Sequence, residues 1–109
     1  MGFKKVTAII QWEALERVEK ALEEEGTPGI GVSPVKGYGD YADFYKSPPL
    51  VRHARIEIFT DDFRVASTVK LIIDTAHTGL AGDGVVAVMP AEHLYRIRDK
   101  TEMQPAGRG

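Results

Sequence analysis

The sequence contains no cysteine, which excludes disulfide bonds, thiolate nucleophiles and metal sites built on cysteine. It also lacks any apolar run near the ~18 residues that a membrane-spanning helix needs. The stretch from Met1 to Glu13 holds only a short apolar segment, so we expect no signal peptide and no membrane insertion. A chain without cysteine fits a reducing compartment, and we predict a cytoplasmic protein.

The chain also lacks a marked excess of charge of either sign. Its 14 basic and 16 acidic residues give a net charge of −2 at pH 7. Nucleic-acid binding needs a basic surface, so we expect no nucleic-acid partner, and any anion site must be local. With 109 residues, of which 43% are hydrophobic and 28% charged, the sequence is typical of one globular domain.

Hydrophobic periodicity predicts alternating strands and helices. Strands are predicted over residues 3–10, 30–36, 55–60 and 85–89, and a last extended segment over 93–98. Helices are predicted over 12–25 and from a cap at Asp61 to Gly79. Pro34 cannot donate a hydrogen bond to a neighbouring strand, so the strand that contains it should lie at a sheet edge.

The resulting order, βαββαβ with a C-terminal extension, favours an α+β fold. Two amphipathic helices pack most naturally on one side of an antiparallel sheet, which is the ferredoxin-like arrangement. That topology places the second strand at an edge, in agreement with Pro34. We predict one domain over residues 1–98, with a long loop over 37–53, and a flexible tail over 99–109.

Two short motifs point to a phosphate-binding site. Gly82-Asp83-Gly84 leaves backbone N–H groups open to an anion, because no Cβ of a glycine blocks the approach. Alternation along a strand would put Arg96 and Arg98 on one face, roughly 6.5 Å apart, a spacing that suits adjacent phosphates. Each motif has an ordinary alternative: a simple turn for the first, and solvated arginines paired with acidic residues for the second.

Five motifs in register resemble the PII signal-transduction family, from about Phe3 to Arg98. They are Val35-Lys36-Gly37-Tyr38-Gly39, Arg55-Ile56-Glu57-Ile58, Thr75-Ala76-His77-Thr78-Gly79, Gly82-Asp83-Gly84 and Arg96-Ile97-Arg98. The resemblance implies a homotrimer that is not an enzyme and that binds adenine nucleotide in each cleft between neighbouring subunits. It further implies that the long loop controls a partner protein, such as a membrane transporter or an enzyme.

The resemblance also implies roles for individual residues. Gly82, Asp83 and Gly84 would hold phosphates through backbone N–H groups, and Arg96 and Arg98 would reach phosphate and ribose from a neighbouring subunit. Other residues implied at the nucleotide come from the loop base and from two strands: Ile9, Gly37, Tyr38, Gly39, Glu57, Ile58 and Phe59. No cofactor beyond these ligands is implied.

Three positions depart from the family pattern and bear on ligand choice. Val85 stands where the family has a lysine, His53 aligns with a loop lysine that touches phosphate and 2-oxoglutarate, and Tyr41 replaces a glutamine that supports magnesium. We therefore expect ADP or AMP to bind at least as well as ATP, without the standard 2-oxoglutarate response. Bicarbonate or another small anion would have space near Arg52 and His53.

The sequence leaves two alternatives open. The loop aromatics either pack on one another or form a partner-docking patch, for which the candidates are Tyr41, Phe44 and Tyr45. The chain could also be a metal-binding trimer that resembles the divalent-cation-tolerance proteins, which share this fold. Its ligands would be His77, His93 and Glu92, whose spacing matches no ligand pattern, so we predict no metal site. A dedicated enzyme would need a nucleophile beside a general base, which the sequence does not indicate.

Overall fold

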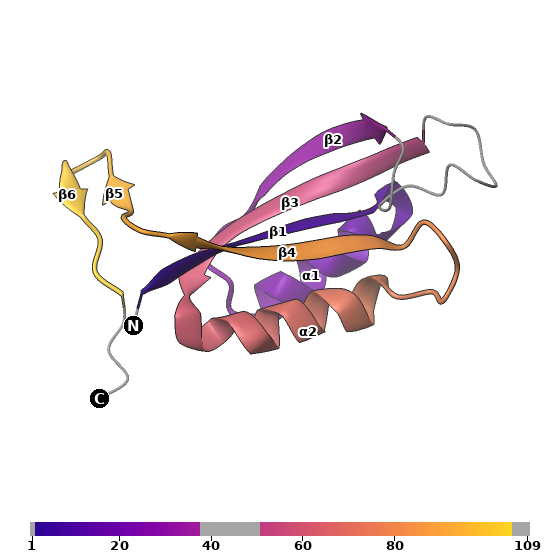
Figure 1. Ribbon diagram of the computed structural model, residues 1–109, viewed down its shortest axis with the longest axis horizontal. Coiled ribbons are helices and arrows are strands. Elements are labelled where there is room, and N and C mark those ends of the chain that lie inside the picture. The colour runs from indigo at the N-terminus through magenta and orange to yellow at the C-terminus, as the bar shows by residue number, and fades with distance from the viewer. Residues whose placement is uncertain (1, 38–50, 106–109) are drawn as a thin grey trace.

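A computed structural model of the chain describes residues 2–37 and 51–105. Its first half consists of β1 (Phe3–Gln11), a 3-10 turn η1 (Trp12–Ala14), α1 (Leu15–Glu25) and β2 (Gly31–Gly37). Its second half consists of β3 (Val51–Asp61), a 3-10 turn η2 (Asp62–Arg64), α2 (Val65–Ala76), β4 (Gly84–Ala91), β5 (Tyr95–Arg96) and β6 (Thr101–Glu102). Figure 1 shows the four long strands as one layer above the two helices.

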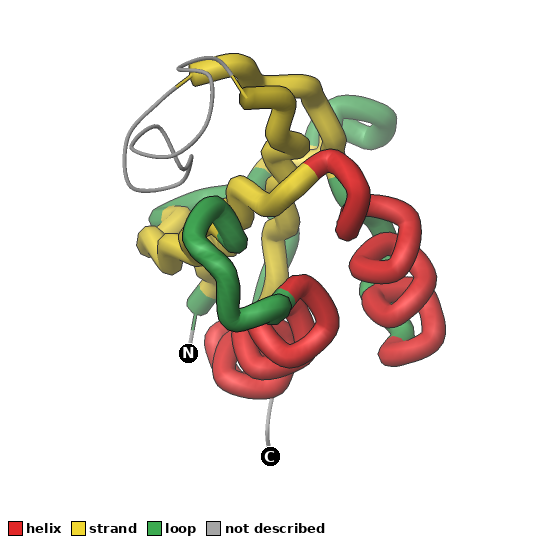
Figure 2. The backbone as a smooth tube through the Cα atoms, turned by 90° about the vertical axis from the view of Figure 1, so that its right-hand side faces the viewer, coloured by secondary structure: helices red, strands yellow, loops and turns green. Residues whose placement is uncertain are grey.

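The sheet has the strand order β2-β3-β1-β4, and every neighbouring pair is antiparallel. Helices α1 and α2 contact each other, and Figure 2 shows them as adjacent red coils. This arrangement confirms the predicted ferredoxin-like α+β fold. It also confirms that β2, which contains Pro34, lies at a sheet edge, where the missing N–H group of proline is best tolerated.

The core lies between the sheet and the helices. Alternation along β1 turns Val6, Ala8 and Ile10 toward the helices, where each is at most 2% exposed. The opposing helices contribute residues such as Leu22 and Ile72. Burial of each large aliphatic side chain stabilises the fold by roughly 1.5–3 kcal/mol. Helix α1 ends where Gly26 adopts a left-handed φ of 99°, as its sequence predicts.

Strand pairing extends β3 beyond its predicted start at Arg55. The strand begins at Val51, because Arg52 pairs with Lys36 of β2 and His53 pairs with Gln11 of β1. The loop predicted over 37–53 is therefore bounded by strand residues at both ends, and its residues 38–50 lie outside the described part of the chain.

The second helix also differs from its prediction at both ends. The side chain of Asp61 does not cap it, since η2 precedes α2 and no side-chain cap hydrogen bond forms. The helix ends at Ala76 rather than at Gly79. The physical reason is that the following turn satisfies its backbone N–H groups with the carboxylate of Asp83.

The prediction of one extended segment over residues 93–98 is wrong. Only Tyr95–Arg96 is a strand, and it forms a hairpin with Thr101–Glu102. The turn forms because the carboxylate of Asp99 accepts hydrogen bonds from the backbone N–H and the hydroxyl of Thr101. Arg98 lies in this turn, so Arg96 and Arg98 do not share a strand face as the alternation had predicted. The domain boundary predicted at residue 98 falls inside the hairpin, and residues 106–109 of the predicted tail lie outside the described residues.

Candidate functional site

The Gly82-Asp83-Gly84 motif lies in the turn between α2 and β4. This turn is at the end of the molecule where β2 enters and β3 leaves the long loop (Figure 1). This follows from the antiparallel order of the sheet, because the end of β2 and the starts of β3 and β4 all lie at the same end of the sheet. The structure therefore places the predicted phosphate-binding turn beside the loop base.

The carboxylate of Asp83 closes the turn from within. It accepts hydrogen bonds from the backbone N–H of Thr78 at 2.8 Å, the Thr78 hydroxyl at 2.5 Å and the backbone N–H of Gly79 at 3.0 Å. Nδ1 of His77 lies 3.9 Å away. Partial burial of Asp83 opposes its charge, yet the hydrogen bonds from Thr78 and Gly79 outweigh burial and lower its pKa. The aspartate thus shapes the turn with its side chain, which sequence reasoning had not identified.

Backbone conformation favours glycine at both Gly82 and Gly84, and a close backbone contact adds a second reason at Gly84. Gly82 and Gly84 both have positive φ angles, of 93° and 110°. A Cβ at Gly84 would lie 1.8 Å from the carbonyl oxygen of Ile9 and 2.9 Å from its carbonyl carbon. Gly84 is therefore required by the close approach of β4 to β1. The sequence had suggested only that a glycine leaves room for an anion.

The loop base is joined to this turn by His53. The side chain of His53 is buried, with 1% exposure, and its Nε2 lies 3.2 Å from the carbonyl oxygen of Gly82. The neighbouring Arg52 stacks its guanidinium over the Trp12 ring, 3.8 Å from the ring centroid. Sequence reasoning had placed both residues near an anion, but neither the carbonyl partner nor the tryptophan partner was visible in the sequence.

The two arginines lie at the opposite end of the molecule. Figure 1 shows the β5–β6 hairpin at one end of the sheet and the turn before β4 at the other. The 8 residues of β4 separate them, which corresponds to about 25 Å. Nη1 of Arg96 is 3.2 Å from a carboxylate oxygen of Asp99, and Arg98 is exposed. One chain therefore does not bring its own arginines to its own Gly82–Gly84 turn.

The hairpin is also held by an imidazole–carboxylate contact. Nδ1 of His93 lies 2.5 Å from Oε2 of Glu102, and the His93 ring stacks on Tyr95. The hydrogen bond from His93 to Glu102, supported by the negative charges of Glu102 and Glu92, raises the pKa of His93. Protonated His93 thus favours the closed hairpin that carries Arg96.

The other predicted nucleotide residues divide between the two ends. Ile9 contacts the start of β4, and Glu57 forms an ion pair with Lys5 at 3.3 Å. Ile58 is 1% exposed in the core, so only its backbone is available to a ligand. Phe59 is 52% exposed and borders a cavity of about 370 Å³ near the hairpin, together with Leu94, Tyr95 and Met103. Gly37 ends β2, whereas Tyr38, Gly39, Tyr41, Phe44 and Tyr45 lie outside the described residues.

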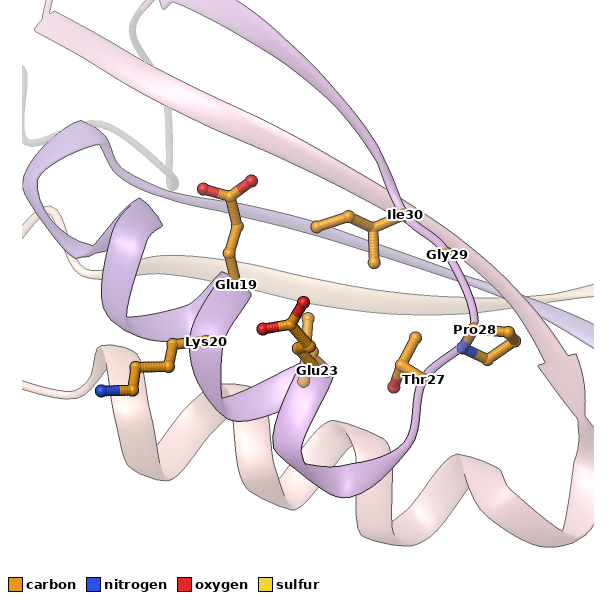
Figure 3. A pocket seen from close by; sticks show the side chains of 8 residues that line it. Glu19, Lys20, Glu23, Thr27, Pro28, Gly29 and Ile30 are labelled. Carbon is orange, nitrogen blue, oxygen red and sulfur yellow. The ribbon is translucent and has the colours of Figure 1, made fainter.

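A further hollow of about 420 Å³ lies between α1 and the start of β2 (Figure 3). Glu19, Glu23 and Thr27 border it, and none of them belongs to the predicted site. Within residues 2–37 and 51–105, no group of three or more histidine, aspartate or glutamate side chains is placed to hold a metal ion. The helices in the same part of the chain are too short or too polar to cross a membrane.

Comparison with known proteins identifies the family. The model of the family described as "Nitrogen regulatory protein P-II" matches residues 3–101. A nitrogen regulatory protein P-II of Azospirillum brasilense is 36% identical over 102 residues, covering 87% of this chain and 91% of that protein. The namesake from Nostoc punctiforme is also 36% identical, and that from Cereibacter sphaeroides 32%, with the same coverage.

A solved structure agrees with the sequence relatives. The crystal structure of Arabidopsis thaliana PII bound to citrate superimposes with a TM-score of 0.81 and 30% identity, covering 94% of this chain and 90% of that one. Both the fold and the predicted resemblance are thereby confirmed. The chain belongs to the P-II family of nitrogen regulatory proteins, whose members are regulatory signal-transduction proteins and not enzymes.

Proposed function

We propose that this chain forms a cytoplasmic homotrimer that binds adenine nucleotides in the clefts between its subunits and thereby controls a partner protein. The observation that carries the proposal is the separation of the two halves of the site. Within one subunit, the Gly82–Gly84 turn and Arg96 lie at opposite ends of the folded molecule, about 25 Å apart along β4. A second copy of the chain would bring an arginine-bearing hairpin to the turn.

The turn supplies the phosphate end of the proposed site. Backbone N–H groups next to glycines present partial positive charge without a side chain in the way. The side chain beside them is that of Val85, which is 39% exposed and uncharged. Because no lysine stands there to neutralise a third phosphate, ADP or AMP should bind at least as well as ATP.

The hairpin of the neighbouring subunit supplies the cations. Arg96 is already aligned by its ion pair with Asp99 and would exchange that carboxylate for phosphate oxygens. Arg98 is exposed in the adjacent turn and would contact phosphate or ribose. Phe59 and Glu57, which lie in the second half of β3, toward the hairpin, would contact the base. Gly37, Gly39, Tyr38 and Ile9 would border the nucleotide on the turn side.

The proposal extends to a second effector at the loop base and to a partner protein at the loop. The Arabidopsis PII structure holds citrate, and here a smaller anion such as bicarbonate would find the guanidinium of Arg52 at the loop base. The loop aromatics Tyr41, Phe44 and Tyr45 would contact the partner, for which we propose a membrane transporter or an enzyme.

Titration calorimetry with AMP, ADP and ATP, combined with light scattering to measure the mass of the assembly, tests the proposal. We expect the mass of a trimer. We also expect Arg96→Ala to bind nucleotide about tenfold or more weakly, because it loses one hydrogen bond from a charged donor. Arg17→Ala is the matched control, because Arg17 is exposed on α1 and its Nη1 donates a hydrogen bond to the backbone carbonyl of Glu13 in η1, away from the proposed site. A chain that binds none of the three nucleotides would overturn the site. Binding of ATP that is much tighter and requires 2-oxoglutarate would overturn the nucleotide preference.

A further inference from the structure

His53 donates a hydrogen bond to the backbone of the proposed phosphate-binding turn. Its Nε2 lies 3.2 Å from the carbonyl oxygen of Gly82, and the side chain is 1% exposed. A carbonyl oxygen accepts hydrogen bonds and never donates them. Nε2 of His53 therefore carries the proton in this contact, which defines the orientation of the Gly82–Asp83 peptide unit.

The orientation of that peptide decides where a backbone donor points. The described chain has no cis peptide bond, and in a planar trans peptide the C=O and N–H bonds point in opposite directions. The carbonyl of Gly82 faces the buried imidazole, so the N–H of Asp83 in the same peptide unit points away from His53. On that side of the turn the N–H can meet an anion.

We propose that His53 is a positioning residue that holds this N–H toward the bound phosphate. The proposal rests on the proposed function, because it assigns a role within the same nucleotide site. Gly82 has a φ of 93° and no Cβ, so its backbone is compatible with more than one orientation of the following peptide. A flipped peptide would turn the Gly82 carbonyl oxygen toward the phosphate, where the two negative ends repel each other.

The same contact connects the turn to the long loop. His53 lies in β3 two residues after its first residue, Val51, where the chain returns from the loop, and Arg52 between them stacks on Trp12. Asp83 braces the other side of the turn through Thr78 and Gly79. His53 thus links the Gly82–Asp83 peptide directly to the loop base.

Three variants separate a donated hydrogen bond from simple packing. The amide nitrogen of glutamine reaches about as far as Nε2 of histidine, whereas asparagine reaches only the Nδ1 position. We expect His53→Gln to bind ADP and inorganic tripolyphosphate within a few-fold of the parent protein. His53→Asn and His53→Leu should bind both about tenfold or more weakly. Calorimetry gives the affinities, and circular dichroism checks the fold of each variant.

A second readout follows the backbone donor itself. In 15N-labelled protein, tripolyphosphate should shift the amide resonance of Asp83 strongly in the parent and in His53→Gln, and weakly in His53→Asn. A purely structural role for His53 would not produce this difference among folded variants. If His53→Leu fails to fold, the comparison of asparagine with glutamine gives the result.

The outcomes distinguish the two proposals. If the parent binds nucleotide and all three variants bind equally well, the positioning role is overturned while the proposed function stands. The positioning role is also overturned if His53→Gln binds as weakly as His53→Leu. If the parent protein binds neither ADP nor tripolyphosphate, the proposed function fails and the role of His53 fails with it.

Discussion

Replacement of Gly84 by alanine should strongly destabilise the fold. The added Cβ would lie 1.8 Å from the carbonyl oxygen of Ile9, 2.9 Å from its carbonyl carbon and 3.1 Å from the Cα of Ile10. All three atoms are backbone, so no side-chain rotation relieves the overlap. Gly84 also has a φ of 110°, which alanine rarely adopts.

Two costs combine in this variant. A residue other than glycine held at such a φ costs about 1–3 kcal/mol. The start of β4 must also move away from β1, which weakens the pairing of Gly84 with Ile10 and of Val85 with Ile9. Each ladder hydrogen bond lost there costs about 0.5–1.5 kcal/mol. The free energy of unfolding should therefore fall by about 3 kcal/mol or more, which lowers the melting temperature by about 12 °C or more.

Urea unfolding followed by circular dichroism, at one protein concentration and without ligand, measures this loss. The matched control is Gly31→Ala in β2, where a Cβ would meet nothing within 4 Å. We expect the control to change stability by about 0.5 kcal/mol at most. Equal stability of the two variants would refute the conclusion that Gly84 is required by the approach of β4 to β1.

Three further predictions concern side chains. Asp83→Asn should lose about 1–3 kcal/mol of stability in urea unfolding. The pKa of Asp83 is lowered by folding, so its contribution is present above the ordinary value of 3.8 and lost as the pH falls through the lowered pKa. A difference between the variant and its parent that persists at lower pH would contradict this. In an NMR titration, the pKa of His93 should lie above 6.5, and it should fall in the Glu102→Gln variant. The stability that the His93–Glu102 pair gives to the hairpin is present below pH 6.5. It is lost as the pH rises through the raised pKa of His93. Arg52→Ala should change the fluorescence of Trp12, the single tryptophan, and cost about 0.5–1 kcal/mol, whereas Arg55→Ala should leave the emission unchanged.

Local pattern was enough to predict most of the fold. The alternation of Val6, Ala8 and Ile10 identified β1 and its buried face, and Pro34 identified the edge strand β2. Two predictions failed where a side chain redirects the backbone. Asp99 turns the chain after Arg96, and Asp83 draws Thr78 and Gly79 out of the helix that the sequence had continued to residue 79.

The sequence by itself determined the element types, their order and the motifs that a phosphate site needs, because these depend on periodicity and on residue chemistry along the chain. Only the tertiary structure decided where those motifs lie and what they contact. His53 and Gly82 are 29 positions apart in the sequence, which conceals their hydrogen bond, and the clash at Gly84 exists only because β1 lies beside β4. The distance between the turn and Arg96 likewise follows from the length and direction of β4, so the observation behind our proposal of an intersubunit site becomes visible only in three dimensions.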